Sequence, residues 1–198
     1  MSYEIFRALV ALSIATLFTP GPNNAMLANS GATFGFRRSL PHLLGVALGF
    51  PVMVLIVGLV LGQLFQTSPL LREVMRWGGA ALLLWIAVKM AFAGSAKAKA
   101  QLASPMGFGA ASAFQWINPK AWSMAIAATS QFITPAAPVT TATIVAATFA
   151  GLGLISAATW VGLGQAISRW LTTEWRRRGF NITMALLIVL SMIDLLRH

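Results

Sequence analysis

The chain has 198 residues, of which 58% are hydrophobic and only 9% are charged. Soluble domains carry about a quarter charged residues, so this composition excludes an ordinary soluble domain and indicates a membrane protein. A net charge of +10 would suggest a nucleic-acid partner in a soluble protein, but here the basic residues lie between apolar runs, where they set membrane orientation. Cysteine is absent, and His42 and His198 are far apart. We therefore expect no disulfide, no metal site and no cofactor.

The first hydrophobic segment contains no charged residue from Ala8 to Phe36, which is long enough to cross a bilayer. Its centre is the hexapeptide Thr19-Pro20-Gly21-Pro22-Asn23-Asn24. Two prolines and a glycine break a helix, and a break in hydrocarbon is tolerated only where protein or a polar cavity surrounds it. We predict one broken transmembrane helix over about residues 4–34, with Asn23 and Asn24 capping its second half. The alternative is a signal-like helix that ends in a surface loop.

Two further spans complete the first half of the chain, over about residues 43–65 and 70–93. Gly45 with Gly49, and Gly58 with Gly62, are spaced four apart, which lets another helix approach closely. Packing within the monomer is favoured over a dimer face, although a homodimer stays open. A small polar linker over residues 93–104 then separates the two halves.

The second half begins with a predicted helix over about residues 107–132, interrupted at Asn118-Pro119-Lys120. An uncharged turn at 134–138 leads to a helix at 139–167. A strongly basic segment at 169–179 is predicted as a loop, and its two tryptophans suit the headgroup layer. A last helix covers about residues 180–196.

The segments therefore repeat as two sets of three, over about residues 1–93 and 107–198. Paired interruptions at corresponding positions of two halves indicate a transporter binding site. Three crossings per half leave the second half starting from the opposite side, so the repeats are inverted. The fold class predicted is an all-α membrane protein of six transmembrane helices, in one domain, with the first and fourth helices broken near the midplane.

Membrane orientation follows from the basic residues on each side. One side receives Arg37, Arg38, Lys89, Lys97, Lys99, Arg169, Arg176, Arg177 and Arg178, and the other receives Arg7, Arg72, Arg76 and Arg197. The positive-inside rule places the first group in the cytoplasm and both termini outside.

Lys120 is the only basic residue at mid-depth in a predicted helix, where an ammonium is costly and marks a functional site. Its structural alternative is to satisfy carbonyls freed by Pro119. The acidic residues all fall near segment ends. A zwitterion therefore suits the site, with its carboxylate on Lys120 and the half-helix amino ends, and its ammonium on unwound carbonyls. The substrate-binding residues predicted are Pro20, Gly21, Pro22, Asn23, Asn24, Gln115, Asn118, Pro119 and Lys120.

These motifs resemble those of a known family. Thr19 to Asn24, Gly35-Phe-Arg-Arg38 and Gly45-Val-Ala-Leu-Gly49 are similar to the first-half signature of the LysE/RhtB amino-acid exporters, and Phe114-Gln-Trp-Ile-Asn-Pro-Lys120 to the second. The resemblance implies efflux of amino acids or their derivatives across the inner membrane of a bacterium, driven by the proton gradient. Within the family, the chain is most similar to exporters of cysteine and O-acetylserine, or of threonine and homoserine.

The function predicted is thus a secondary transporter that exports small neutral amino acids, with membrane lipid and the amino acid as partners. A passive channel for small zwitterions is the alternative, because no residue pattern proves coupling. An enzyme is disfavoured, since no serine motif accompanies either histidine.

Overall fold

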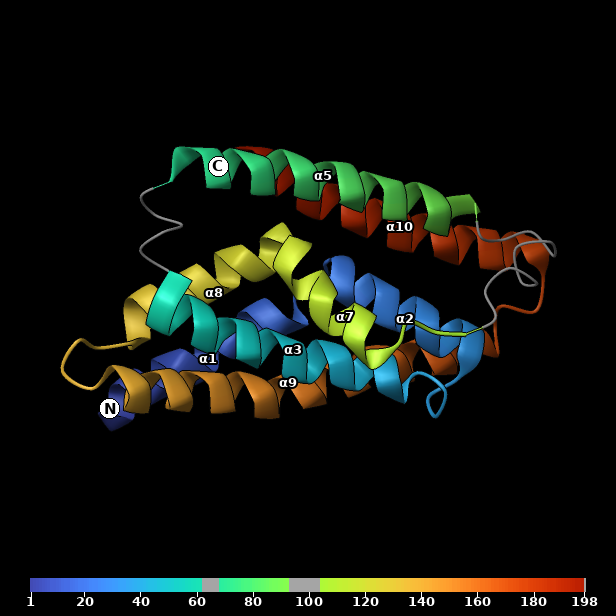
Figure 1. The fold of residues 1–198 in the computed structure, drawn as a ribbon. Helices are drawn as coiled ribbons and strands as arrows, with labels where there is room; N and C mark the ends of the chain where they lie inside the picture. The colour runs from blue at the N-terminus through green and yellow to red at the C-terminus, as the bar shows by residue number, and fades with distance from the viewer. Residues whose placement is uncertain (62–67, 93–103, 198) are drawn as a thin grey trace.

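A computed structural model describes residues 1–61, 68–92 and 104–197 of the chain (Figure 1). Gly62, Phe65 and most of the predicted linker, with Lys97 and Lys99, lie outside the described residues. The described part is helical and contains no strand. Its elements are α1 (Tyr3–Phe18), α2 (Pro22–Phe34), α3 (Leu40–Ile56), a π-helical turn (Val57–Leu61), α5 (Pro69–Phe92), α7 (Phe108–Phe114), a 3₁₀ turn (Gln115–Ile117), α8 (Pro119–Phe132), α9 (Pro138–Ser168) and α10 (Glu174–Arg197).

The first predicted span is broken as expected, into α1 and α2, which are bent by 56° relative to each other. The predicted caps are wrong. Gly21 occupies the N-cap of α2 and Pro22 its first turn, so both asparagines lie inside the helix. Proline suits the first turn because its missing N–H would have no helical partner there.

The second break is narrower than the first. α7 tightens into the 3₁₀ turn, and Asn118 alone then separates that turn from α8. The Asn118 side chain accepts a hydrogen bond from the Lys120 amide at 3.1 Å, so it caps α8.

Three long helices have bounds close to those predicted, whereas α10 does not. α10 begins at Glu174, so most of the predicted basic loop is helical. The Thr173 hydroxyl accepts a hydrogen bond from the Arg176 amide at 3.3 Å, and Glu174 lies in the first turn. A hydroxyl cap and an acidic first turn favour a helix start, and these local signals outweigh the charge of the segment.

The apolar outer face of α3 is typical of a lipid contact. Exposed side chains recur every fourth residue along it, at Leu40, Leu44, Leu48, Val52 and Ile56. Positions four apart lie on one face of a helix. α3 with its extension (Leu40–Val60) and α9 are each long and apolar enough to span a membrane, and the bent pair α1 and α2 forms a third candidate among the described residues.

Glycines bring the helices together within the chain. A Cβ on Gly45 would collide with the backbone of Phe108, and one on Gly49 would lie 2.7 Å from the Ser112 Cα, so α3 packs directly on α7. Gly31 of α2 and Gly164 of α9 approach each other's helix backbone in the same way. Gly45 and Gly49, which are spaced four apart, therefore serve helix packing within the monomer, as predicted.

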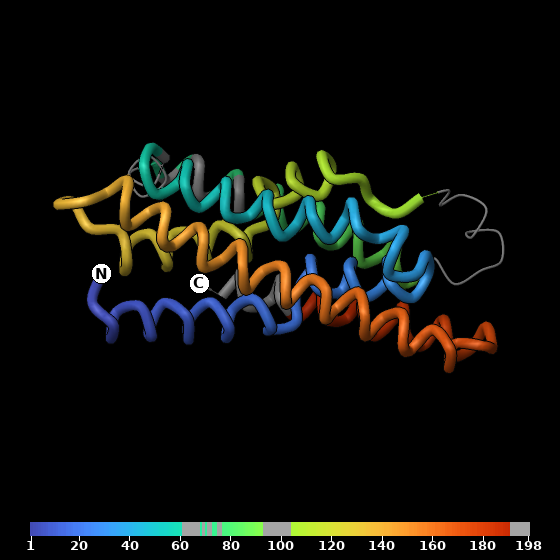
Figure 2. The backbone as a smooth tube through the Cα atoms, turned by 90° about the horizontal axis from the view of Figure 1, so that it is seen from below, coloured from blue at the N-terminus to red at the C-terminus, as the bar shows by residue number. Residues whose placement is uncertain are grey.

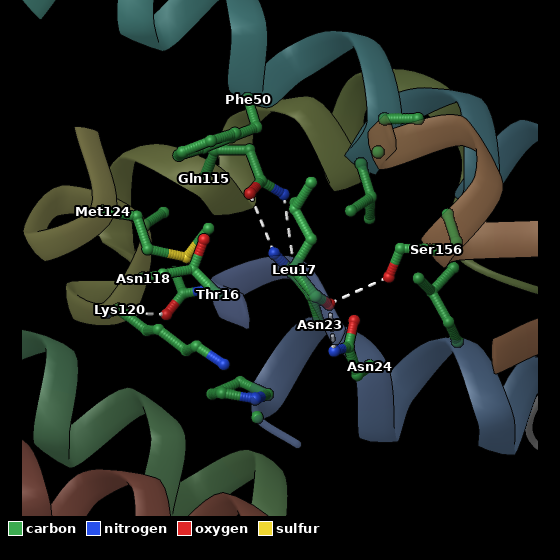
Figure 3. Close-up of a pocket in the computed structure, with 18 of the residues that line it drawn as sticks. Thr16, Leu17, Asn23, Asn24, Phe50, Gln115, Asn118, Lys120, Met124 and Ser156 are labelled. Carbon is green, nitrogen blue, oxygen red and sulfur yellow. Dashed lines mark hydrogen bonds between the residues drawn. The ribbon is translucent and has the colours of Figure 1, made fainter. Parts of the chain in front are cut away.

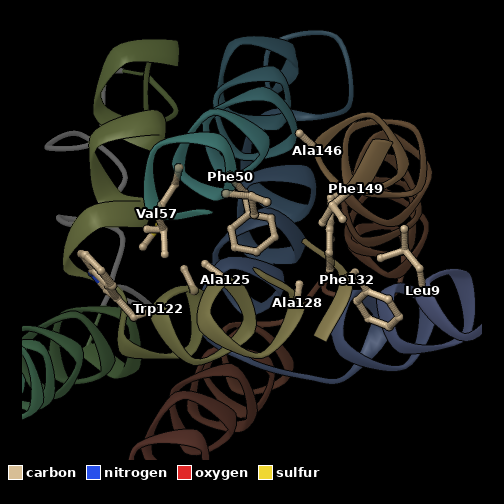
Figure 4. Packing of buried hydrophobic residues seen from close by; sticks show 13 residues of the cluster. Leu9, Phe50, Val57, Trp122, Ala125, Ala128, Phe132, Ala146 and Phe149 are labelled. Atoms are coloured by element: carbon tan, nitrogen blue, oxygen red, sulfur yellow. The ribbon is translucent and has the colours of Figure 1, made fainter. Parts of the chain in front are cut away.

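The buried core lies between α1, α3, α8 and α9 (Figure 4). Phe50 and Phe149 meet edge to face with ring centroids 5.2 Å apart, and small residues such as Ala125 let α8 lie close against them. Aromatic rings in this geometry add to the stabilisation gained from burial. α5 and α10 form a separate pair that packs on α2 and α8.

α3 and α9 run in opposite directions, and so do α5 and α10 (Figure 1). α3 contacts α9, and α5 contacts α10. α1 and α2 run one way through the molecule, whereas α7 and α8 run the other (Figures 1 and 2). Both chain ends therefore lie at the same end of the bundle.

Candidate functional site

A small cavity of about 50 Å³ lies where the two breaks meet, in the middle of the bundle (Figure 3). Because a cavity needs about 10–15 Å³ of such volume to hold one water molecule, this one has room for a few waters. Its walls come from α1, α2, α3, α8, α9 and the 3₁₀ turn, and the lining residues are Thr16, Leu17, Gly21, Pro22, Asn23, Asn24, Leu27, Val46, Ala47, Phe50, Gln115, Asn118, Lys120, Ala121, Met124, Phe149, Gly153, Ser156 and Ala157.

The carbonyls left free at the end of α1 are satisfied by side chains from elsewhere. Asn24 donates to the carbonyls of Leu17 and Thr19 at 2.8 and 2.9 Å. Ser156 of α9 also donates to the Leu17 carbonyl, at 2.8 Å. Asn24 therefore stabilises the helix before it instead of capping its own. Such donors are required, because a helix end buried without partners is costly.

Lys120 crosses from the second break to the first. Its ammonium donates to the carbonyls of Thr19 at 2.8 Å and Pro20 at 3.4 Å. The side chain lies over Gly21, where an added Cβ would be only 3.0 Å from Nζ. The lysine therefore binds carbonyls freed at the first break. The structural alternative drawn from the sequence was carbonyls freed by Pro119, at the second break.

An amide pair also joins the two breaks. Asn23 donates to the Gln115 side-chain oxygen at 2.8 Å, and Gln115 donates back at 3.4 Å and to the Ala111 carbonyl at 2.9 Å (Figure 3). Gln115 is completely buried, so these partners hold its amide in one orientation.

The electrostatics of the cavity favour an anionic group. The N-termini of α2 and α8 both lie at the cavity, and each carries a partial positive charge. Lys120 adds a full charge, and the described lining residues include no carboxylate. The carbonyls of Thr19 and Pro20 provide acceptors beside these positive groups.

The predicted residues are brought together around one point. Gly21, Pro22, Asn23, Asn24, Gln115, Asn118 and Lys120 line the cavity, and the Pro20 carbonyl accepts from Lys120. Pro119 does not line it, and packs instead against Gly79 of α5, where an added Cβ would be 2.6 Å from the proline ring.

Sequence reasoning missed the wall supplied by α1, α3 and α9. Ser156 of α9 and Thr16 of α1 are polar members of that wall, and Phe50 of α3 and Phe149 of α9 form much of its apolar part. A serine among small residues in a long apolar helix is a weak signal for such a role, and the aromatic residues carry none.

The family model and the curated relatives that match this chain both describe transport proteins. The model of the family described as "LysE type translocator" matches residues 14–198. The cysteine/O-acetylserine efflux proteins of Escherichia coli, Shigella sonnei and Salmonella typhimurium are each 30% identical over 190 residues, which cover 96% of this chain and 96% of each relative. No solved structure matches the chain significantly.

Proposed function

Because the chain belongs to the LysE-type translocator family, we propose that it exports small neutral amino acids or their derivatives, such as cysteine and O-acetylserine, from the cytoplasm in exchange for protons. Family membership makes the protein a membrane transporter and not an enzyme. The single observation that carries the substrate proposal is the contact of Lys120 with the Thr19 and Pro20 carbonyls across the cavity.

The proposed substrate binds as a zwitterion. Its carboxylate takes the positive region formed by Lys120 and the amino ends of α2 and α8. Its ammonium binds the carbonyls of Thr19 and Pro20, which accept hydrogen bonds from the Lys120 ammonium in this structure. The substrate thus supplies both an anion that draws Lys120 away and a cation that replaces it.

The cavity is too small for an amino acid, so substrate binding requires it to widen. We propose that the six helices form two inverted repeats in one domain, which alternately open the site to either side. The contacts of α3 with α9 and of α5 with α10, each pair running in opposite directions, support this relation. Binding then requires the broken helices to separate.

The proposed orientation places the end of the bundle with residues 35–39 and 169–173 in the cytoplasm of a bacterium, at its inner membrane. Both termini then face outward. Since the chain has no cysteine, single cysteines can be introduced without background. Arg178→Cys at an exposed position of α10 should react with an impermeant maleimide only after the cells are opened, and Arg7→Cys, also exposed, should react in intact cells. The opposite labelling pattern would show that the protein has the reverse orientation.

The direct test of the function is counterflow in proteoliposomes. Vesicles loaded with one unlabelled amino acid are diluted into a labelled panel containing cysteine, O-acetylserine, serine, threonine, lysine and glutamate. We expect the small neutral members to accumulate, and lysine and glutamate to exchange far more slowly. If no amino acid in the panel exchanges, the proposed function is wrong.

The same vesicles separate a carrier from the passive channel. A carrier accumulates label transiently against its gradient when unlabelled substrate leaves, whereas a channel does not. Export that continues unchanged after the proton gradient is collapsed, without counterflow, would favour the channel.

A further inference from the structure

A second, larger cleft lies beside the central cavity and contains a buried histidine that the substrate site does not use. The cleft has a volume of about 1180 Å³ and is lined by α2, α3, α5, α7 and residues 104–106. It lies toward the end of the bundle that carries residues 35–39, and its lining includes Asn29, Ser30, His42, Trp85 and Lys89. From this arrangement we infer that His42, hydrogen-bonded to Ser30, carries the proton that drives export.

The environment of His42 is unusual for a structural histidine. The side chain is 2% exposed. Nδ1 lies 3.0 Å from the Ser30 hydroxyl of α2, so one ring nitrogen is partnered. Nε2 is buried and has no hydrogen-bond partner among the described residues. A purely structural histidine at this depth would be expected to have both nitrogens satisfied.

Among the described residues that line the cleft, His42 is the group suited to take up and release a proton. Lys89 of α5 lines the cleft, with its ammonium 4.2 Å from the centre of the Trp85 ring. Arg38, before α3, lies 5.6 Å from the centre of the Phe34 ring at the cleft wall. α2, α7 and α9 contain no ionisable residue. No carboxylate lines the cleft in the described part of the chain, and histidine is the side chain that changes charge near neutral pH.

His42 is connected to the substrate site through two helices. Val46, one turn further along α3, lines the central cavity on the same helix face. Ser30 lies two turns along α2 from Asn23, about 10 Å at 1.5 Å per residue, and Asn23 bonds Gln115 at the cavity. A movement of α2 or α3 that alters the Ser30–His42 contact therefore alters the cavity as well.

Protonation gives this contact two states. With Nδ1–H donating to the Ser30 hydroxyl, Nε2 of the neutral ring carries no proton. In the closed state, a proton added to Nε2 would place an N–H and a positive charge in a buried position without an acceptor among the described residues, which is strongly unfavourable. Protonated His42 therefore favours a conformation in which water from a neighbouring space reaches Nε2. Deprotonated His42 favours the closed contact. The proton equilibrium thus biases a conformational equilibrium.

In the proposed cycle, one proton is taken up outside and released inside for each amino acid exported. Nε2 takes up a proton from the external side after the amino acid has left, and the protonated carrier returns to the inward-facing state. There the cleft admits water, Nε2 releases the proton to the cytoplasm, and the vacant site binds the next substrate. The inference rests on the proposed export function, because the proton must be exchanged for something.

His42→Gln tests the proposal in proteoliposomes. Glutamine can retain a hydrogen bond to Ser30 but cannot carry a proton. The matched control is His198→Gln, at the only other histidine. We expect His42→Gln to keep amino-acid counterflow within about twofold while gradient-driven accumulation falls about tenfold, which is within the usual range of coupling between two sites. His198→Gln should match the wild type in both assays.

The outcomes separate the two proposals. Absence of counterflow in the wild type overturns the export function. If the wild type shows counterflow, two results overturn the role of His42. One is gradient-driven accumulation in His42→Gln equal to that of the wild type, and the other is a wild type that does not respond to the gradient.

If His42→Gln does not fold, the His198→Gln protein gives a second measurement, because His42 is then its single imidazole. Binding linkage is reciprocal, so a saturating amino acid that exchanges in counterflow should shift the titration of His42 observed by NMR of labelled histidine. A titration that the amino acid leaves unchanged also overturns the proposal.

Discussion

The two helix breaks differ in how their free backbone groups are satisfied. At the first break, the carbonyls of Leu17, Thr19 and Pro20 depend on Asn24 of α2, Ser156 of α9 and Lys120 of α8. At the second break the partners are local. Asn118 caps α8, and the Trp122 indole donates to the Trp116 carbonyl at 2.8 Å.

This difference in hydrogen-bond partners suggests different roles for the two breaks in substrate binding. The second break would keep its local hydrogen bonds when neighbouring helices move, so it can hold the backbone of Lys120 in place while the lysine side chain turns from the carbonyls to a substrate carboxylate. The first break exchanges partners whenever α2, α8 or α9 shifts, so its carbonyls are available to a substrate ammonium. We propose that the first break is the adaptable half of the site and the second is its anchor.

The largest effect is expected from removing the anchor's charge. Lys120→Met should lower amino-acid counterflow about 100-fold, because a charge-assisted contact contributes about 1.5–3 kcal/mol and the substrate loses its partner. The fold should survive, since the Thr19 carbonyl keeps Asn24 as a donor. Arg7→Met, which removes a cation outside the cavity, is the control. Normal counterflow in folded Lys120→Met would show that the lysine is structural.

A second prediction concerns the packing behind the anchor. Gly79→Ala should lower the free energy of unfolding by about 1–3 kcal/mol, because its Cβ would lie 2.6 Å from the Pro119 ring and overpack the contact. Gly78→Ala, next to it, meets nothing within 4 Å and should be neutral or slightly stabilising. Unfolding titrations with SDS in mixed micelles measure both. Equal effects of the two substitutions would contradict the close contact of α5 with the second break.

The adaptable break should show non-additive energetics. Asn24→Ala and Ser156→Ala each leave the Leu17 carbonyl one donor, so each should cost about 1 kcal/mol. The double variant removes both donors, and its cost should exceed the sum by about 1 kcal/mol. Asn24→Ala combined with Asn118→Ala, which share no acceptor, should be close to additive. The same unfolding assay applies, and additivity of the first pair would show that the shared carbonyl is not a common acceptor.

The smallest effect is expected at Gly21. Gly21→Ala places a Cβ 3.0 Å from the ammonium and Cδ of Lys120, which is a flexible side chain that can shift by a few tenths of an ångström. Backbone strain is not expected, because Gly21 is extended with φ of −176°. We predict a several-fold weaker substrate affinity with unchanged unfolding. An affinity equal to that of the wild type would mean that the position of the ammonium over the break is unimportant.

Both breaks could be predicted from the sequence because their cause is local. Pro22 and Pro119 each remove an amide donor, and that effect does not depend on the rest of the fold. The site residues followed from the breaks, and family membership confirms the resemblance on which the exporter prediction also rested.

The partners of the break carbonyls could not be predicted, because they are chosen by tertiary packing. Ser156 lies 139 positions from the carbonyl that it binds. Asn24 looked like an N-cap from its position after Pro22, but its side chain turns back to the preceding helix. The helix start at Glu174 was not predicted for another reason, because its signals, the Thr173 cap and the acidic first turn, lie within a strongly basic segment.

The central claim is that the Lys120 ammonium, bound to the Thr19 and Pro20 carbonyls, occupies the place that the substrate ammonium takes on binding. The most direct measurement compares the binding of an exchanged amino acid and its decarboxylated amine to the wild type and to Lys120→Met, by calorimetry in detergent. In the wild type, the amine must displace the lysine without offering it a carboxylate. We predict that Lys120→Met weakens binding of the amino acid at least tenfold and strengthens binding of the amine. Amine binding that is unchanged or weaker in Lys120→Met would contradict the claim.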